Sequence, residues 1–211
     1  MSTRQVEDSR EWGTGPRTDA LPGAGAVCRA SKEASLVIGE YRTPWGTGSV
    51  TVSEGLLVGV ELPGASGSGS HPLPTSGKAT LIDKAALEHW VGELEGYFRG
   101  ERLAWRAEDI SLDCLGLGAF ERSVYTTLLS VPPAVTVSYG VLAEMAGHPR
   151  AARAVGNAMA ANPVPVVVPC HRVIRSDGSL GNYGHDPAWK ERLLAHERTH
   201  ASMPGRVREG G

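Results

Sequence analysis

Apolar residues gather in three short segments in the first third of the chain: 36–41, 48–52 and 56–62. Short apolar runs of this kind are typical of strands, and Gly46 and Gly55 separate the segments as turn residues would. Apolar residues then recur at three- and four-residue spacing over 82–98, which predicts an amphipathic helix ending near Gly100. These patterns predict an α/β N-terminal domain, made of a small antiparallel sheet plus a helix.

From Phe120 onward the spacing of apolar residues becomes helical. It predicts a first helix over 120–129, a second over 139–146 with Ser138 as its cap, and a third over 150–161. Gly147 ends the second helix, and the tight turn that follows joins it to the third. Two short helices joined in this way predict a helix-turn-helix within a mainly helical C-terminal domain. The alternative is a helical hairpin that binds nothing.

The segments between and beyond these patterns are rich in glycine, serine and proline or lack an apolar period. We expect residues 1–34 and 201–211 to be flexible tails and 64–78 to be a loop. Residues 101–118 are predicted to hold one further strand and a connector. The chain is thus expected to contain an N-terminal scaffold domain, 35–115, and a C-terminal domain, 119–200, that carries the chemistry.

Composition narrows the function classes. The 211 residues are 41% hydrophobic, yet no apolar run approaches the roughly 18 residues of a membrane span, and no signal peptide begins the chain. The three cysteines are widely spread, which argues against a disulfide framework and for a reducing compartment. No Cys or His spacing suits a metal. The net charge of −2 divides into −5 for residues 1–118 and +3 for residues 119–211, which permits nucleic-acid binding by the second half.

The strongest chemical signal is Cys170 followed by His171, in a stretch that begins with an apolar run and Pro169. A thiol with a pKa of about 8.5 is mostly protonated at neutral pH, and an apolar setting would raise that pKa further. A reactive cysteine therefore needs a base within reach, which the neighbouring imidazole can supply. The alternative is an inert cysteine buried for packing.

Four blocks follow one another in order: Asn162-Pro163-Val164-Pro165, Pro169-Cys170-His171-Arg172-Val173, Gly181-Asn182-Tyr183 and Leu194-Ala195-His196-Glu197. Together they resemble the O6-alkylguanine-DNA alkyltransferases, which repair DNA by direct reversal. The resemblance runs from about Phe120 to Glu197. It implies that Cys170 is the nucleophile and alkyl acceptor, that His171 is the general base, and that Glu197 orients His171. It also implies that Tyr139 donates a proton to the departing guanine. Packing for Tyr139 and a solvated helix-end charge for Glu197 are the alternatives.

The resemblance also implies how DNA is held. The third predicted helix would lie in the minor groove, and its small residues, Ala151, Ala152, Ala154 and Gly156, would allow close approach with little sequence reading. Arg153 would occupy the place of the extruded base. An Ala-rich helix packed in a core and an arginine that clamps phosphate are the alternatives.

The resemblance further implies a pocket for the base. Its expected residues are Asn162, Val173, Tyr183, Gly184 and Lys190. Asn162 would tie the reading helix to the active-site segment, and Lys190 could equally be a solvated helix charge. Many members of the resembled family have glycines after the pocket tyrosine, whereas this chain has Gly184-His185-Asp186-Pro187. Whether its pocket accepts bulky alkyl groups is therefore left open.

The implied function is removal of the alkyl group from O6-alkylguanine, and possibly from O4-methylthymine, in a single irreversible transfer to Cys170. No cofactor motif is present, and none is expected. The expected partner is double-stranded DNA, bound by a monomer in the cytoplasm, or in the nucleus if the source is eukaryotic. A sensor that binds damaged DNA without reacting and a Cys-His-Glu hydrolase are the alternatives.

Overall fold

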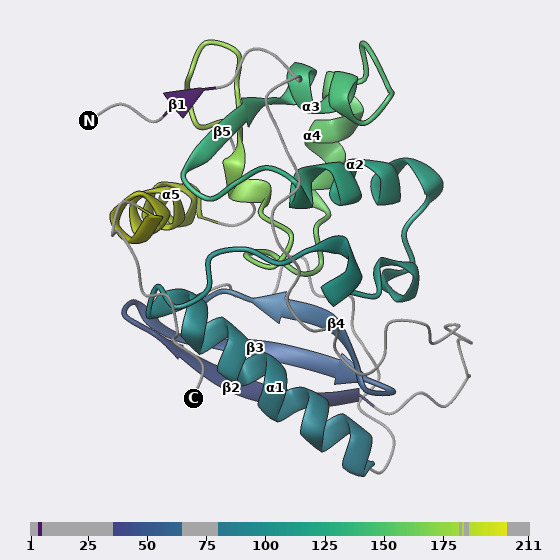
Figure 1. Ribbon diagram of the computed structural model, residues 1–211, viewed down its shortest axis with the longest axis vertical. Coiled ribbons are helices and arrows are strands. Elements are labelled where there is room, and N and C mark those ends of the chain that lie inside the picture. The colour runs from purple at the N-terminus through teal and green to yellow at the C-terminus, as the bar shows by residue number, and fades with distance from the viewer. Residues whose placement is uncertain (1–3, 6–35, 65–79, 182, 184–185, 202–211) are drawn as a thin grey trace, which may run out of the picture.

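The computed structural model describes residues 4–5, 36–64, 80–181, 183 and 186–201. Its N-terminal half contains an antiparallel sheet whose strand order is β2-β3-β4 (Figure 1). The strands are β2 (Leu36–Thr43), β3 (Gly46–Ser53) and β4 (Leu56–Glu61). The turns between them use Gly46 and Gly55, both with positive φ, because an L side chain is disfavoured there. The predicted small antiparallel sheet is confirmed.

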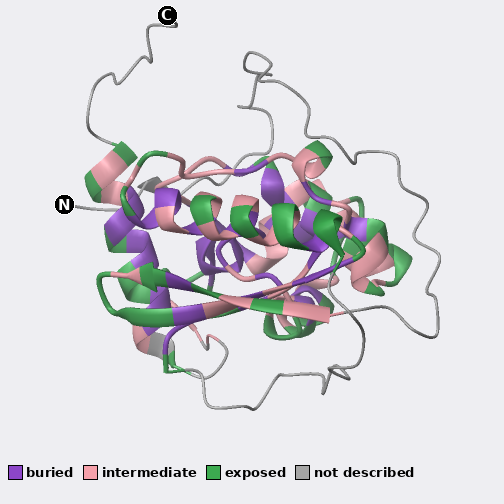
Figure 2. Cartoon of the chain, turned by 90° about the horizontal axis from the view of Figure 1, so that it is seen from below, coloured by how far each residue is buried: buried purple, intermediate pink, exposed green. Residues whose placement is uncertain are grey.

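Helix α1 (Leu81–Phe98) packs across this sheet (Figure 1). It begins with a capping box, in which the Thr80 side chain accepts from the Asp83 amide and Asp83 accepts from the Thr80 amide. The apolar side chains Trp90, Leu94 and Tyr97 are buried, whereas other positions of the helix, among them Lys84 and Glu88, are exposed (Figure 2). The apolar spacing in the sequence therefore predicted this helix correctly.

The strand predicted within 101–118 is wrong. The structure has two 3-10 helices there, η1 (Ala107–Asp109) and η2 (Leu112–Leu115). Asp109 accepts hydrogen bonds from the Arg106 amide at 2.9 Å and from the Arg102 side chain at 2.6 Å. Such local side-chain bonds favour a turn over a strand ladder, which would need a partner strand.

Four α-helices dominate the C-terminal half (Figure 1). They are α2 (Ala119–Leu129), α3 (Tyr139–Met145), α4 (Ala152–Ala160) and α5 (Pro187–Ala201). The Ser138 hydroxyl accepts from the Val141 amide and caps α3, as predicted, and Gly147 follows that helix with a φ of 79°. Helix α4 begins two residues later than expected, because Arg150 has a φ of 70° and cannot belong to the helix.

The helical C-terminal half also contains a small parallel sheet that the sequence did not predict. Strand β5 (Val135–Ser138) lies between β1 (Arg4–Gln5) and β6 (Val173–Ile174). Residues 4–5 are therefore paired with β5, and the flexible tail over 1–34 stays a prediction. The remainder of 1–34, together with 202–211, lies outside the described residues. The sheet places β6, which directly follows the Cys170 segment, against the start of α3.

The two halves of the chain share one apolar core and are also joined by hydrogen bonds. The Val60 amide donates to the Pro163 carbonyl at 2.9 Å, and the Trp189 indole donates to the Pro63 carbonyl at 3.0 Å. The division into domains at 35–115 and 119–200 stays a prediction. Among the described helices, none has the length and apolar character that crossing a membrane requires.

Candidate active site

Cys170 opens the short 3-10 helix η3 (Cys170–Arg172), and Asn162 fixes its position. The Asn162 Nδ2 group donates to the Val168 carbonyl at 2.9 Å and to Cys170 Sγ at 3.1 Å. Its Oδ1 atom accepts from the Val164 amide at 3.1 Å. One carboxamide therefore holds the loop before the cysteine at two backbone positions and reaches the sulfur with the same amino group.

The Cys170 thiol is only 4% exposed. Burial raises its pKa, whereas the hydrogen bond from Asn162, the contact with Tyr183 and the charge of Lys190 act in the opposite direction. The Tyr183 hydroxyl lies 3.6 Å from Sγ. The thiol is thus mainly protonated at neutral pH, but the side chains around it favour the thiolate.

His171 and Glu197 form a fully buried pair, with His171 Nε2 2.7 Å from Glu197 Oε1. Burial lowers the pKa of His171, although the carboxylate opposes this shift. A carboxylate accepts hydrogen bonds, so Nε2 carries the proton and Nδ1 holds the lone pair. Within the described part of the chain, Nδ1 is buried without a hydrogen-bond partner. It is therefore the ring nitrogen that can take up a further proton.

Glu197 is held ionised by its surroundings. The Arg172 guanidinium donates to both carboxylate oxygens at 2.7 to 3.2 Å, and the Ala134 amide donates to Oε2 at 2.8 Å. Burial alone would raise the pKa of Glu197, but its interactions with His171 and Arg172 outweigh burial and lower that pKa. The alternative of a solvated helix-end charge is therefore wrong, because Glu197 is fully buried in α5.

Lys190, also on α5, is 1% exposed, so the alternative of a solvated helix charge is wrong for it as well. Its Nζ donates to the Leu180 carbonyl at 2.5 Å and lies 5.7 Å from the Tyr139 ring and 5.9 Å from the Tyr183 ring. Burial lowers the pKa of Lys190 to about 8. Burial and the nearby Cys170 raise the pKa of Tyr139, so this phenol keeps its proton. The Lys190 ammonium group and the Tyr139 phenol thus both lie near Cys170.

Helix α4 presents a partly exposed surface of small residues next to Tyr139. Arg153 and Ala154 are exposed, and Ala151, Ala152 and Gly156 are half-buried. A Cβ atom at Gly156 would lie 4.0 Å from the Tyr139 ring, so the two helices pack closely there. Arg153 makes no hydrogen bond or ion pair with any described residue. The alternative of an Ala-rich helix packed wholly in a core therefore does not hold.

Two predicted pocket residues have different outcomes. Val173 is fully buried in β6, where its amide donates back to the Cys170 carbonyl, so it supports η3 from the core. Gly184 lies outside the described residues, as does His185 in the same loop. Whether this loop narrows the pocket for the base therefore stays open, as it was from the sequence.

Sequence reasoning missed two side chains that contact Glu197. Arg172 lies directly before the apolar pair Val173 and Ile174, which was a signal that this charged side chain could be buried in an ion pair. Tyr97 donates from α1 to Glu197 Oε1 at 3.1 Å across one hundred residues of sequence. Periodicity cannot reveal a contact at that separation.

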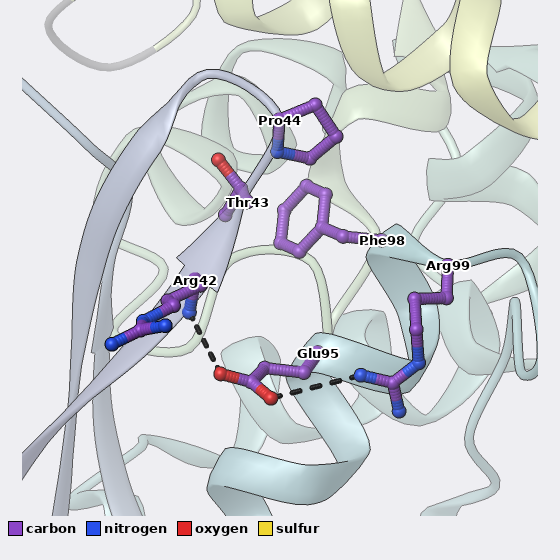
Figure 3. A pocket seen from close by; sticks show the side chains of 6 residues that line it. All are labelled: Arg42, Thr43, Pro44, Glu95, Phe98 and Arg99. Carbon is purple, nitrogen blue, oxygen red and sulfur yellow. Dashed lines mark hydrogen bonds and ion pairs between the residues drawn. The ribbon is translucent and has the colours of Figure 1, made fainter.

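The described residues contain no group of three His, Cys, Asp or Glu side chains that could hold a metal ion. A cavity of about 250 Å³ lies apart from the predicted site residues, between the end of β2 and the end of α1 (Figure 3). Glu95 in this cavity accepts from the Arg42 amide at 3.1 Å and pairs with Arg99 at 3.6 Å. The Glu95 carboxylate is thus satisfied locally, and Phe98 and Pro44 line the same cavity.

A buried cysteine that accepts a hydrogen bond, next in sequence to a histidine paired with a carboxylate, is the arrangement of a candidate thiol nucleophile. The family described as "6-O-methylguanine DNA methyltransferase, DNA binding domain" matches residues 119–199. The methylated-DNA–protein-cysteine methyltransferase of Mycobacterium bovis is 41% identical over 119 residues, which cover 56% of this chain and 70% of that relative. The chain belongs to the methylated-DNA–protein-cysteine methyltransferase family.

Other relatives agree with this assignment. The mouse methylated-DNA–protein-cysteine methyltransferase is 46% identical over 118 residues, which cover 53% of this chain. That match spans only 54% of the mouse protein's length. The crystal structure of Mycobacterium tuberculosis OGT in complex with DNA superposes with a TM-score of 0.62 at 32% identity, covering 77% of this chain and 93% of that chain. The similarity thus includes both the sheet-containing half and the half with Cys170.

Proposed function

We propose that this protein repairs DNA by direct reversal, transferring the alkyl group of O6-alkylguanine to Cys170 Sγ. The observation that carries the proposal is the set of contacts around Cys170, His171 and Glu197, in which a buried thiol has a donor at 3.1 Å and an imidazole is held at 2.7 Å by a carboxylate. O6-methylguanine in duplex DNA is the first substrate that we propose, and O4-methylthymine is a second.

In the proposed reaction the thiol proton passes to Nδ1 of His171 through a bridging water. Sγ then forms a bond to the alkyl carbon while the bond between that carbon and guanine O6 breaks. The electron pair of the broken bond stays on guanine, and the Tyr139 phenol donates a proton to the ring as the base leaves. Glu197 stabilises the imidazolium without accepting its proton, because Arg172 keeps the carboxylate ionised.

The product is a thioether at Cys170. No step of the proposed reaction regenerates the thiol, and no cofactor takes part in it, so each molecule reacts once.

We infer that α3 and α4 act as a helix-turn-helix that brings DNA to this site. The alkylated base must leave the stack to reach a sulfur that is 4% exposed. The exposed Arg153 has no partner among the described residues, so its planar guanidinium is available to replace the base in the stack. The small side chains of α4 would allow close approach to a groove. We expect the protein to act as a monomer, inside the compartment that holds the DNA.

Intact mass after incubation with duplex DNA carrying O6-methylguanine tests the proposal. The expected result is one added methyl group per molecule, located on Cys170 by peptide mapping. The Cys170→Ala protein should bind the DNA without gaining mass, whereas Cys114→Ala, a matched loss of a thiol outside the site, should react normally. Binding without an adduct in the unsubstituted protein would indicate a non-reactive sensor, and repeated turnover would indicate a hydrolase; either outcome overturns the proposal.

Arg153 has its own test. We expect Arg153→Ala to slow transfer from duplex DNA by about tenfold or more, since extrusion costs a few kcal/mol, and to leave transfer from free O6-methylguanine unchanged. Arg99→Ala, which removes an exposed arginine from α1's end, serves as the control. Equal losses on duplex and free base would exclude a role in extrusion.

A further inference from the structure

The Glu197 carboxylate receives one of its hydrogen bonds from the half of the chain that the sequence marked as scaffold. The Tyr97 hydroxyl, on α1, donates to Oε1 at 3.1 Å, and this is the same oxygen that holds His171 Nε2 at 2.7 Å. Because both groups share one oxygen, the direction of the phenol donor restricts where that oxygen can lie.

The Tyr97 ring is held rigidly, so its hydroxyl has a fixed position. The side chain is fully buried, stacks on Trp105 with ring centroids 5.9 Å apart, and meets Phe98 edge to face at 5.1 Å. Burial and the neighbouring Glu197 raise the pKa of Tyr97 well above its usual range, so the phenol stays a donor throughout the working pH range. A rigid, permanently protonated donor suits the task of orienting a carboxylate.

A second contact connects the same two regions. The Arg172 guanidinium, which pairs with Glu197, also donates to the Leu103 carbonyl at 2.7 Å and to the Val131 carbonyl at 2.5 Å. The segment that follows α1 therefore positions the cation, and α1 itself positions the carboxylate through Tyr97. Glu197 and Arg172, the two charged groups next to His171, are thus both hydrogen-bonded to residues that precede Phe120.

We propose that Tyr97 is a positioning residue for alkyl transfer, whose hydroxyl fixes the Glu197 carboxylate so that Nδ1 of His171 is presented to the thiol proton. This inference rests on the proposed function. It assigns the N-terminal half a direct part in the chemistry beyond that of a scaffold.

The charged and titratable groups around this carboxylate come from three elements. Arg172 and His171 belong to η3, Tyr97 belongs to α1, and Lys190, whose charge acts on His171, belongs to α5. His196, also on α5, meets the Tyr97 ring in a tilted contact with the ring centroids 5.2 Å apart. Loss of the phenol donor would leave more negative charge on Oε1. The imidazolium would then be held more strongly, and the pKa of His171 would rise.

The test compares Tyr97→Phe with Tyr41→Phe. Tyr41 is a matched control because it is also fully buried in the N-terminal half, and its hydroxyl donates to the Glu61 carbonyl at 2.9 Å, outside the site. Single-turnover transfer from O6-methylguanine duplex is measured against DNA concentration and against pH, with thermal unfolding measured in parallel. Each variant loses one buried hydroxyl, so a purely structural effect should appear equally in both.

We expect Tyr97→Phe to lower the first-order rate constant at saturating DNA by about threefold to tenfold, with unchanged DNA affinity. The acidic limb of its pH–rate profile should move upward by about half a pH unit, because His171 stays protonated to a higher pH. Tyr41→Phe should change neither quantity. In a Glu197→Gln background, Tyr97→Phe should have no further effect, since its action passes through that carboxylate.

Identical rate constants and pH limbs in the two variants would overturn the inference, as would an undiminished effect of Tyr97→Phe in the Glu197→Gln background. A Tyr97→Phe protein that fails to fold while Tyr41→Phe folds would also overturn it, since the hydroxyl would then serve structure alone. Failure of the proposed function is a separate result, because the unsubstituted protein would then form no adduct at Cys170.

Discussion

Removal of the Asn162 carboxamide should make Cys170 a weaker acid. The amide Nδ2 donates to Sγ at 3.1 Å, and a donor at that distance stabilises the thiolate more than the thiol. Hydrogen bonds to charged groups contribute about 1.5–3 kcal/mol, and one pKa unit corresponds to about 1.36 kcal/mol. Asn162→Ala should therefore raise the pKa of Cys170 by about 1–2 units.

The sign of the pH dependence follows from that shift. The thiolate fraction at a fixed pH below the pKa falls about tenfold for each unit by which the pKa rises. At pH 7.5 the variant should thus react about ten to one hundred times more slowly, and raising the pH should restore its rate. Asn162→Asp should shift the pKa further than Asn162→Ala, because a carboxylate oxygen would replace the donor and repel the thiolate.

The assay uses a small alkylating reagent, so it does not depend on DNA binding. The rate of modification at Cys170 is followed against pH by peptide mass, and Cys114 in the same molecule serves as the internal control. The pH midpoint should rise in the order unsubstituted protein, Asn162→Ala, Asn162→Asp, with the Cys114 profile unchanged. An unmoved midpoint in Asn162→Ala would show that the contact does not stabilise the thiolate and would refute this reasoning.

Two further substitutions test the packing. Glu197→Gln keeps the shape of the side chain but leaves the buried Arg172 cation without its counterion. The free energy of unfolding, measured with urea, should therefore fall by about 3–5 kcal/mol, and a fall below about 1 kcal/mol would contradict the buried ion pair. Gly48→Ala should cost about 2–3 kcal/mol in the same assay, because its Cβ would overlap the Tyr41 ring. Gly59→Ala in the same sheet, where a Cβ meets only ordinary contacts, is the control, and equal losses would refute the steric argument.

Local patterns predicted the elements that local forces determine. The strand-like runs within 36–62 and the Ser138 cap both reappear in the structure because glycine turns and helix capping depend on neighbouring residues. The strand predicted within 101–118 was wrong because Asp109 satisfies nearby donors and closes a turn. Strands β5 and β6 were missed because short parallel pairing depends on partners far away in the sequence.

The same distinction applies to the candidate site. The structure forms two sets of contacts, in which Asn162 and Tyr183 meet the Cys170 sulfur and His171 pairs with Glu197. The pairing of His171 with Glu197 is the one that the resemblance implied. Their roles in catalysis stay predictions. The sequence around Glu197 does not show that this carboxylate is buried and ionised. The donors that stabilise it there come from three separate segments of the chain, which only the fold brings together.

The burial of Cys170 has a physical consequence for a protein that reacts once. A thiol whose pKa is raised by burial exists mainly in the protonated form, which reacts slowly with electrophiles and oxidants in solution. The groups that favour the thiolate, Asn162 at 3.1 Å and Tyr183 at 3.6 Å, act only over short distances and within an enclosed space. Under the proposed function, a premature reaction would consume the molecule, since no step regenerates the thiol. Under this proposal burial protects Cys170 until an extruded nucleotide lies next to the sulfur, and His171 with Glu197 would then supply the base.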